Sequence, residues 1–344
     1  MNPPGAPSPP GGLIDVHHHF VPEAVHARLR HMAGGSARLV NDQISITLPA
    51  NLCDAEAHLE AMDAAGIATA VLTYSGLSVL GRELCRALNQ GFAELAARFP
   101  GRFVGAAHVD LRDPGAPGEL ERAAGEHGFA AVALPCSSGD LDLDDASLDP
   151  LWEAVDRLAT PVILHPALRP RGATTDHGLE RSCARPFDTT MAAVRLVSSV
   201  LPRYPGLRFV LPHCGGTAVF LKGRLLMFFA HPAEPGARSL PRTRREQVAD
   251  GVDAAFEASW TRLYFDTAGT GAWAPAVAFT AAVVGSDRLM FGSDFPLESH
   301  SPETLCELVG MLGSLDVTEE DRRAIAAGTA RTLLHLDPPP AGTG

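Results

Sequence analysis

The strongest constraint on this chain is an alternation of short, β-rich apolar runs with longer stretches of helical period. Such βα units place parallel strands side by side and cover them with the connecting helices. The strand candidates are Leu13–His17, Ile67–Tyr74, Phe103–Val109, Ala130–Leu134, Pro161–His165, Leu207–His213, Leu263–Thr267 and Arg288–Ser293. These eight units predict an α/β fold whose sheet closes into a (β/α)₈ barrel, the TIM barrel.

The stretches between the strands carry signals for helix ends. Asp54 is the predicted N-cap of a helix that stops before Gly66. Ser301 and Pro302 are typical of the start of another helix, which we expect to contain residues 304–312.

Two segments depart from the bare repeat. Residues 36–50 alternate apolar and polar positions on either side of Asn41 and Asp42, which predicts a small β-hairpin inserted after the first strand. Residues 231–250 are rich in Pro, Gly and Arg and predict an inserted loop after the sixth strand. Neither segment is long enough to form a domain of its own.

The 344 residues fit one barrel domain, which we expect over residues 13–336. Flexible tails are expected at residues 1–12 and 337–344, where Pro and Gly are frequent. Residues 1–12 also lack the basic and apolar regions of a secretion signal. The cysteines form no CxxC pair, which favours reduced thiols in a cytoplasmic protein.

Charge and hydropathy restrict the partners of the chain. No uninterrupted apolar run approaches the roughly 20 residues that cross a bilayer, so no membrane partner is expected. The net charge is −12 and the basic residues are scattered, which argues against nucleic acid as a partner. A small-molecule substrate is the expected partner.

A pair of histidines ends the first expected strand. His17 and His19 are two positions apart, so their side chains share one face and can point together into the mouth of the barrel, whereas His18 points away. Two imidazoles are half of a zinc site. The motif alone is a weak signal, because histidines at strand ends are often packed or hydrogen-bonded residues.

Three more polar groups stand at the ends of other strands. His165 closes PVILH, His213 closes RFVLPH, and Asp294 closes LMFGSD. Barrel enzymes place their active-site groups at this end of the strands. Each residue alone could cap a strand or a helix, but burying all of them unpaired would cost several kcal/mol each. A bound cation explains why they converge.

The ligand types suit one divalent ion, with Zn²⁺ favoured and Mn²⁺ or Fe²⁺ also compatible. We assign the metal to His17, His19, His165 and Asp294. His213 is left either as a residue that hydrogen-bonds a metal-bound water or the substrate, or as the catalytic base and acid. The candidate proton donor is Asp294, or His213 together with a water.

Other residues near strand ends give weaker signals. An aromatic pocket for the substrate is predicted from Phe20, Tyr74, Phe187 and Phe295. The residues Asp266, His108 and Asp110 could either orient a ligand or act as structural caps, and their roles stay open.

The chain resembles the amidohydrolase superfamily, in the branch of aminocarboxymuconate semialdehyde decarboxylase and of the 6-methylsalicylate and resorcylate decarboxylases. The similar segments are IDVHHHFVPE (14–23), RFVGAAHVDL (102–111), PVILHP (161–166), PFDTTMAAVRLV (186–197), FVLPHCGGTAVFLKGRL (209–225), YFDTAG (264–269) and FGSDFP (291–296). The resemblance implies the same metal ligands and the same catalytic role for His213. It also implies a homodimer.

Two departures from relatives bear on the chemistry. Binuclear amidohydrolases bridge two metals with a lysine at the end of strand 4, but the single lysine here, Lys222, follows strand 6. This indicates one metal. The semialdehyde decarboxylases carry a substrate-binding arginine in the inserted hairpin, and Ile44–Pro49 offers none, which favours a substrate with one carboxylate.

The leading hypothesis is a metal-dependent, non-oxidative decarboxylase of a small phenolic or unsaturated carboxylic acid. The same ligands could instead activate a water for hydrolysis of a lactone, ester or amide. A non-catalytic barrel used as a binding module is a third alternative, and it would predict eroded ligand positions.

Overall fold

The structure is a computed structural model, which describes residues 12–174, 176–229 and 241–336. Eight strands form one parallel sheet in the order β1, β4, β5, β6, β9, β10, β11, β12. They are β1 (Leu13–His19), β4 (Ile67–Thr73), β5 (Phe103–His108), β6 (Ala131–Pro135), β9 (Val162–His165), β10 (Phe209–Leu211), β11 (Leu263–Asp266) and β12 (Leu289–Met290). Each overlaps one predicted strand, so the predicted βα alternation is confirmed.

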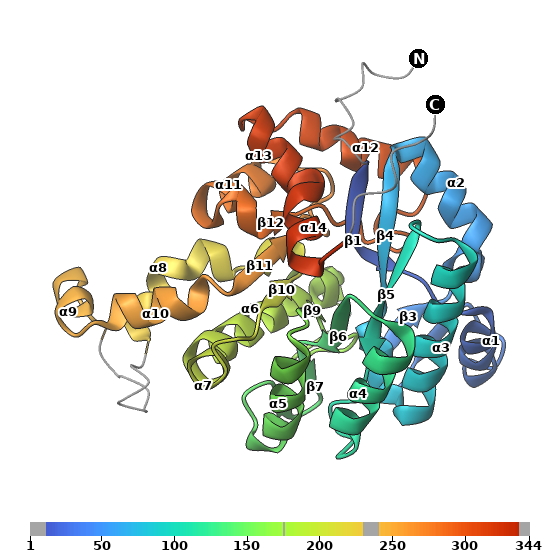
Figure 1. Ribbon diagram of the computed structural model, residues 1–344, viewed down its shortest axis with the longest axis horizontal. Coiled ribbons are helices and arrows are strands. Elements are labelled where there is room, and N and C mark those ends of the chain that lie inside the picture. The colour runs from blue at the N-terminus through green and yellow to red at the C-terminus, as the bar shows by residue number, and fades with distance from the viewer. Residues whose placement is uncertain (1–11, 175, 230–240, 337–344) are drawn as a thin grey trace.

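The segment that follows β12 returns to β1 and closes the sheet. The backbone N–H of Val16 donates to Phe291 O at 3.0 Å. Further along, Asp294 N donates to His17 O, and His19 N donates to Phe295 O, both at 2.8 Å. The sheet is therefore a barrel, and the helices lie around its outside (Figure 1). The predicted (β/α)₈ fold is confirmed.

The longer helices cover the outside of the strands, and α8, α9 and α10 extend to one side (Figure 1). They are α1 (Glu23–Met32), α2 (Ala55–Ala65), α3 (Arg82–Arg98), α4 (Ala116–His127), α5 (Asp149–Leu158), α6 (Arg185–Arg195), α8 (Ala218–Phe228), α10 (Val252–Trp260), α11 (Ala274–Val284) and α12 (Pro302–Gly313). Shorter helices are α7 (Leu201–Arg203), α9 (Arg244–Ala249), α13 (Glu319–Arg323) and α14 (Thr329–Leu334). None of the described helices is long and apolar enough to span a membrane.

The predicted helix ends have the expected chemistry. The side chain of Asp54 accepts from the backbone N–H of Ala57 and caps α2, which ends at Gly66 in the left-handed region at φ 74°. Ser301 accepts from the N–H of Thr304 at the start of α12. Local sequence thus fixes where these two helices begin.

Apolar side chains from the strands fill the barrel interior. The cluster contains Ile14, Val16, Val71, Ala106, Ala131, Ala133, Ile163, Val210 and Met290. Residues of the C-terminal helical segment, including Ala330 and Leu333, pack against it and close one end of the barrel. With one end of the barrel filled, the polar side chains lie at the opposite end, at the carboxyl ends of the strands.

The inserted hairpin is confirmed. Strands β2 (Arg38–Val40) and β3 (Ser45–Thr47) pair antiparallel, and the side chain of Asn41 accepts from the N–H groups of Gln43 and Ile44 at 2.9 Å. Such side-chain contacts favour a tight turn at this position.

The prediction of a loop over residues 231–250 is partly wrong. Residues 230–240 lie outside the described part of the chain, but Arg244–Ala249 forms helix α9. A capping box explains the helix, because Thr243 and Glu246 each hydrogen-bond the backbone of the other. The expected tails fall almost wholly outside the described residues.

Candidate metal centre

The end of β1 orients its histidines through a local irregularity. The pairing of β1 with β4 shifts between Asp15 and His18. Val16 consequently packs in the barrel interior, while His17 and His19 both face the mouth of the barrel. The imidazole rings of His17 and His19 lie edge to face with centroids 5.0 Å apart. The prediction that they share a face is confirmed.

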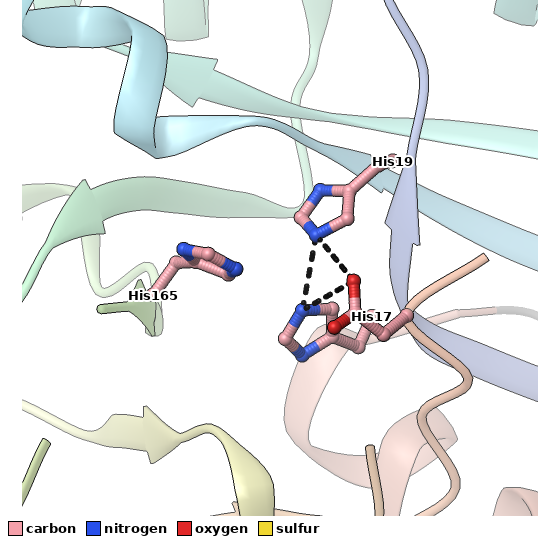
Figure 2. Close-up of side chains that lie close together, drawn as sticks. His17, His19 and His165 are labelled. Atoms are coloured by element: carbon pink, nitrogen blue, oxygen red, sulfur yellow. Dashed lines mark hydrogen bonds and ion pairs between the residues drawn. The ribbon is translucent and has the colours of Figure 1, made fainter. Parts of the chain in front are cut away.

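Four predicted residues from three strand ends meet at one point. One potential ligand atom from each of His17, His19, His165 and Asp294 lies within 4.8 Å of all the others, and all four residues are buried. The Nε2 atoms of His17 and His19 are 3.3 Å apart, and His19 Nε2 lies 2.9 Å from Asp294 Oδ1. Figure 2 shows the His165 ring approaching the pair from the opposite side.

The outer nitrogen of each histidine is held by an acceptor. His17 Nδ1 lies 2.8 Å from Asp266 Oδ2, His19 Nδ1 lies 3.0 Å from Thr73 O, and His165 Nδ1 lies 2.8 Å from Pro166 O. A carbonyl can only accept, so Nδ1 carries the proton in His19 and His165. Their Nε2 lone pairs then face the common point, as in histidine ligands of metals.

Asp294 completes the donor set in a strained backbone. Its φ of 56° lies in the left-handed region, which costs a residue other than glycine about 1–3 kcal/mol. Its Oδ1 is buried and accepts no hydrogen bond from any residue that the structure describes. A divalent cation would satisfy this oxygen and the imidazole nitrogens together. The residues therefore fit a metal of the Zn²⁺ or Mn²⁺ type.

Burial and neighbouring charges shift the pKa values of the cluster residues in opposite directions. Burial lowers the pKa of His17, but the Asp266 carboxylate outweighs burial and raises this pKa to about 9. Burial lowers the pKa of both His19 and His165. Burial raises the pKa of Asp294, yet the facing imidazoles of His19 and His213 outweigh it and hold this pKa well below its usual range. Binding of a cation at His17 thus requires the loss of a proton.

His213 lies beside the four groups rather than among them. Its ring stacks on His17 with centroids 5.2 Å apart, and its Nε2 lies 3.7 Å from Asp294 Oδ2. Its backbone is also strained, with φ at 56°. The buried Nε2 atom has no hydrogen-bond partner among the described residues. It can exchange a proton with a group bound next to Asp294.

Asp266, whose role the sequence left open, has two functions. Its Oδ2 holds His17 Nδ1, while its Oδ1 accepts from the backbone N–H groups of His213 at 2.9 Å and Ala268 at 3.0 Å. One carboxylate therefore orients a candidate ligand and fixes the backbone of the candidate acid and base. A sequence signal existed in its position at the end of β11, but only the structure shows its partners.

His108 and Asp110 have structural contacts. His108 Nε2 accepts from Tyr74 N at 2.9 Å, and its Nδ1 lies 2.9 Å from Ala106 O. Burial lowers the pKa of His108 to about 4, in agreement with a neutral ring. Asp110 accepts from Arg112 N at 2.9 Å. Both residues shape the backbone and neither belongs to the four-residue cluster.

The four predicted pocket aromatics separate in the structure. The Tyr74 ring lies 4.8 Å from the His19 ring and is buried. Phe295 stacks on His18, and Phe20 packs against His58, on the side of β1 that faces away from the cluster. Phe187 is 58% exposed. Of these four, Tyr74 borders the cluster.

Comparisons with known proteins agree with this geometry. The amidohydrolase family model matches residues 14–336. Gamma-resorcylate decarboxylase from Rhodococcus jostii (strain RHA1) is 29% identical over 354 residues, covering 95% of this chain and 99% of the relative.

Two solved structures share the fold. One is 5-carboxyvanillate decarboxylase from Sphingomonas paucimobilis, with a TM-score of 0.76 and 22% identity over 94% of this chain and 99% of that one. The other is dihydroxybenzoic acid decarboxylase from Polaromonas sp. JS666, which holds manganese and the inhibitor 2-nitroresorcinol. Its TM-score is 0.70 at 25% identity, over 94% of this chain and 97% of that one.

The manganese in that neighbour and the buried cluster here support a single divalent metal in this chain. The only lysine of the sequence, Lys222, pairs with Glu257 at 2.8 Å and lies on α8, outside the cluster. The family match spans nearly the whole described barrel. The chain therefore belongs to the amidohydrolase family, in the branch of its metal-dependent decarboxylases.

Proposed function

We propose that this protein is a carboxy-lyase that removes CO₂ from a small aromatic acid with a hydroxyl group next to the carboxylate, without oxidation. The observation that carries the proposal is the convergence of four buried ligand atoms with the unpartnered Nε2 of His213 beside them. The related resorcylate decarboxylase supports the aromatic substrate class.

The metal would be held by His17, His19, His165 and Asp294. Zn²⁺ is our proposal from the ligand types, with Mn²⁺ as the alternative. When bound, the ion supplies Lewis-acid stabilisation to the carboxylate and the neighbouring oxygen of the substrate.

Asp294 and His213 move the proton that the reaction needs. A proton adds to the ring carbon that carries the carboxylate, and the electron pair of the breaking carbon–carbon bond then restores the aromatic ring as CO₂ leaves. Asp294 would deliver this proton to the ring carbon. His213 Nε2, at 3.7 Å from Asp294 Oδ2, is placed to resupply that proton.

Tyr74 is also part of the proposed site. Tyr74 would form one wall of the pocket, since its buried ring lies against His19.

All six cysteines are free. The homodimer and the cytoplasmic location expected from the sequence stay predictions.

The proposal is tested with a panel of ortho-hydroxybenzoic acids in D₂O. We expect CO₂ and one deuterium on the ring carbon that lost the carboxylate, and neither with Asp294→Asn. Turnover of lactones, esters or amides without CO₂ from any aromatic acid would contradict the proposal and favour a hydrolase.

A further inference from the structure

Two of the three candidate histidine ligands hydrogen-bond to backbone carbonyls rather than to a carboxylate. His19 donates from Nδ1 to Thr73 O, and His165 donates from Nδ1 to Pro166 O. Each carbonyl belongs to a planar peptide group that also carries the N–H of the next residue. The partner of that N–H therefore helps to fix the plane in which the carbonyl meets the histidine.

The peptide group between Pro166 and Ala167 connects His165 to a carboxylate. Its oxygen lies 2.8 Å from His165 Nδ1, and its N–H donates to Asp188 Oδ2, also at 2.8 Å. Asp188 lies in the first turn of α6, within the segment PFDTT (186–190). A continuous chain of hydrogen bonds thus runs from the Asp188 carboxylate through one peptide group to the His165 ring.

The loop after β6 holds Asp188 in place. Ser137 donates its hydroxyl to Asp188 Oδ1 at 2.7 Å. The preceding residue, Cys136, donates its backbone N–H to His165 O at 2.8 Å. One oxygen of the carboxylate is therefore anchored to this loop, which also holds the backbone of His165, and the other oxygen holds the Pro166–Ala167 peptide.

The peptide group between Thr73 and Tyr74 has the same arrangement. Its oxygen lies 3.0 Å from His19 Nδ1, and its N–H donates to His108 Nε2 at 2.9 Å. The other ring nitrogen of His108 lies 2.9 Å from Ala106 O, which can only accept, so Nδ1 carries the proton and Nε2 is the acceptor. His108 is thus a neutral acceptor behind His19.

Hydrogen bonds in such chains strengthen one another. An acceptor on the N–H side polarises the peptide group and makes its oxygen a better acceptor. A better acceptor at Nδ1 fixes the orientation of the imidazole and raises the basicity of Nε2, the atom that faces the metal. Asp188 should act more strongly than His108, because a hydrogen bond to a carboxylate is charge-assisted and one to a neutral ring is not.

We propose that Asp188 and His108 are positioning residues of the metal site, which act on His165 and His19 through the peptide groups between them. Together with the direct contact of Asp266, a side-chain acceptor then stands behind every histidine of the cluster. The proposal rests on the proposed function only in taking these histidines as metal ligands. Neither positioning residue is itself among the four candidate ligands.

The affinity for Zn²⁺, measured without substrate by competition with a chelator of known affinity, tests the role of Asp188. Asp188→Ala leaves the Ala167 N–H without its acceptor, so the affinity should fall by about 10–100-fold. Asp188→Asn keeps an oxygen that can accept but loses the charge, so the affinity should fall less, by about 3–10-fold.

The same measurement tests His108. His108→Phe keeps a ring of similar shape and removes the acceptor of the Tyr74 N–H, so the affinity should fall by about 3–10-fold. His108→Gln has an amide oxygen that can accept, and it should restore part of the loss.

Two controls separate this effect from a general loosening of the loops. Ser137→Ala removes the other hydrogen bond of Asp188 and leaves the peptide contact. Asp321→Ala removes a carboxylate that accepts from the hydroxyls of Ser286 and Thr318, close to the amino end of β12. Both variants should keep the Zn²⁺ affinity within about 2-fold, because neither contact lies on a path to a histidine ligand.

The NMR signal of the His165 Nδ1–H proton, recorded in protein saturated with Zn²⁺, reports on the chain of hydrogen bonds itself. The proton resonates further downfield when its acceptor is stronger. It should therefore move upfield in Asp188→Asn and stay in place in Asp321→Ala.

The outcomes decide the positioning roles separately from the activity. Wild-type affinity in folded Asp188→Ala, or an equal fall in Asp188→Ala and Asp321→Ala, would overturn the role of Asp188. If Asp188→Ala does not fold, an unchanged affinity and an unchanged proton signal in Asp188→Asn would overturn it. Wild-type affinity in the folded His108 variants would overturn the role of His108. The predicted order of affinities without CO₂ release from any aromatic acid would instead remove the decarboxylase activity and leave both roles standing.

Discussion

Three successive histidines of β1 occupy two different environments. His17 and His19 direct Nε2 toward the cluster, where Asp294 Oδ1 and His213 Nε2 are buried without hydrogen bonds. His18 faces the other way, and both of its nitrogens have partners. Its Nδ1 lies 2.9 Å from Asp15 Oδ2, and its Nε2 lies 2.8 Å from His58 Nδ1.

The network around His18 continues until every polar group is satisfied. His58 Nε2 lies 2.8 Å from Asn51 O, and Ser293 donates its hydroxyl and its backbone N–H to Asp15. Both sides of β1 are buried and rich in histidine and aspartate, so residue type and burial do not distinguish them. Hydrogen bonding distinguishes the two sides of β1. The side with unpaired polar atoms fits a ligand, and the side whose polar atoms are paired serves as a scaffold.

The largest effect is expected on the unsatisfied side. His17→Ala removes one of the four proposed metal ligands and would leave an incomplete shell. We expect loss of the metal and a fall in turnover of about 10³-fold or more, since the ion supplies several kcal/mol of transition-state stabilisation. Elemental analysis and rate measurements on the same samples check this. Full metal content in His17→Ala would remove His17 from the ligand set.

His213→Ala sharpens the division of roles within the cluster. We expect the metal to stay bound and turnover to fall on the order of 10²-fold, as for loss of a general acid or base. Metal content and rate must be measured together. If both fall in parallel, His213 is a ligand and the assigned roles are wrong.

Asp266→Asn tests the carboxylate behind His17. The amide can still hydrogen-bond His17 but no longer favours the required orientation and basicity of the ring, so metal affinity should fall by about 10–100-fold. Competition with a chelator of known affinity measures the change. An unchanged affinity would show that His17 is positioned by β1 alone.

The smallest effect on the metal is expected on the scaffold side. His58→Ala removes the partner of His18 Nε2 and one of the two donors to Asn51 O, and it opens space in the core, which should lower the free energy of unfolding by about 3 kcal/mol. The folded protein should retain its full metal content. Urea unfolding and elemental analysis check both points, and loss of metal from the folded variant would break the distinction between the two sides.

Most of the fold followed from the sequence because its signals are local. The strand runs, the hairpin around Asn41, and the caps at Asp54 and Ser301 depend on neighbouring residues, and the structure confirms them. Helix α9 was missed because the Pro- and Gly-rich composition of 231–250 obscured the capping box at Thr243.

The convergence of the cluster could also be predicted, since strands of one barrel end at one edge. The contact of Asp266 with His213 could not, because it depends on the register of β10 against β11. The pocket aromatics show the same limit. A residue next to a strand end can face the mouth, as Tyr74 does, or the helices, as Phe295 does, and one irregularity in a strand reverses the direction.

The most direct test of the difference between the two sides of β1 is anomalous X-ray diffraction from crystals of the protein loaded with Mn²⁺ or Zn²⁺. We predict a single anomalous peak per chain at coordination distance, about 2.0–2.2 Å, from His17, His19, His165 and Asp294. No peak should lie at His18 and His58, whose nitrogens are already hydrogen-bonded. Two peaks in the barrel mouth, or a peak at His18 and His58, would contradict this account.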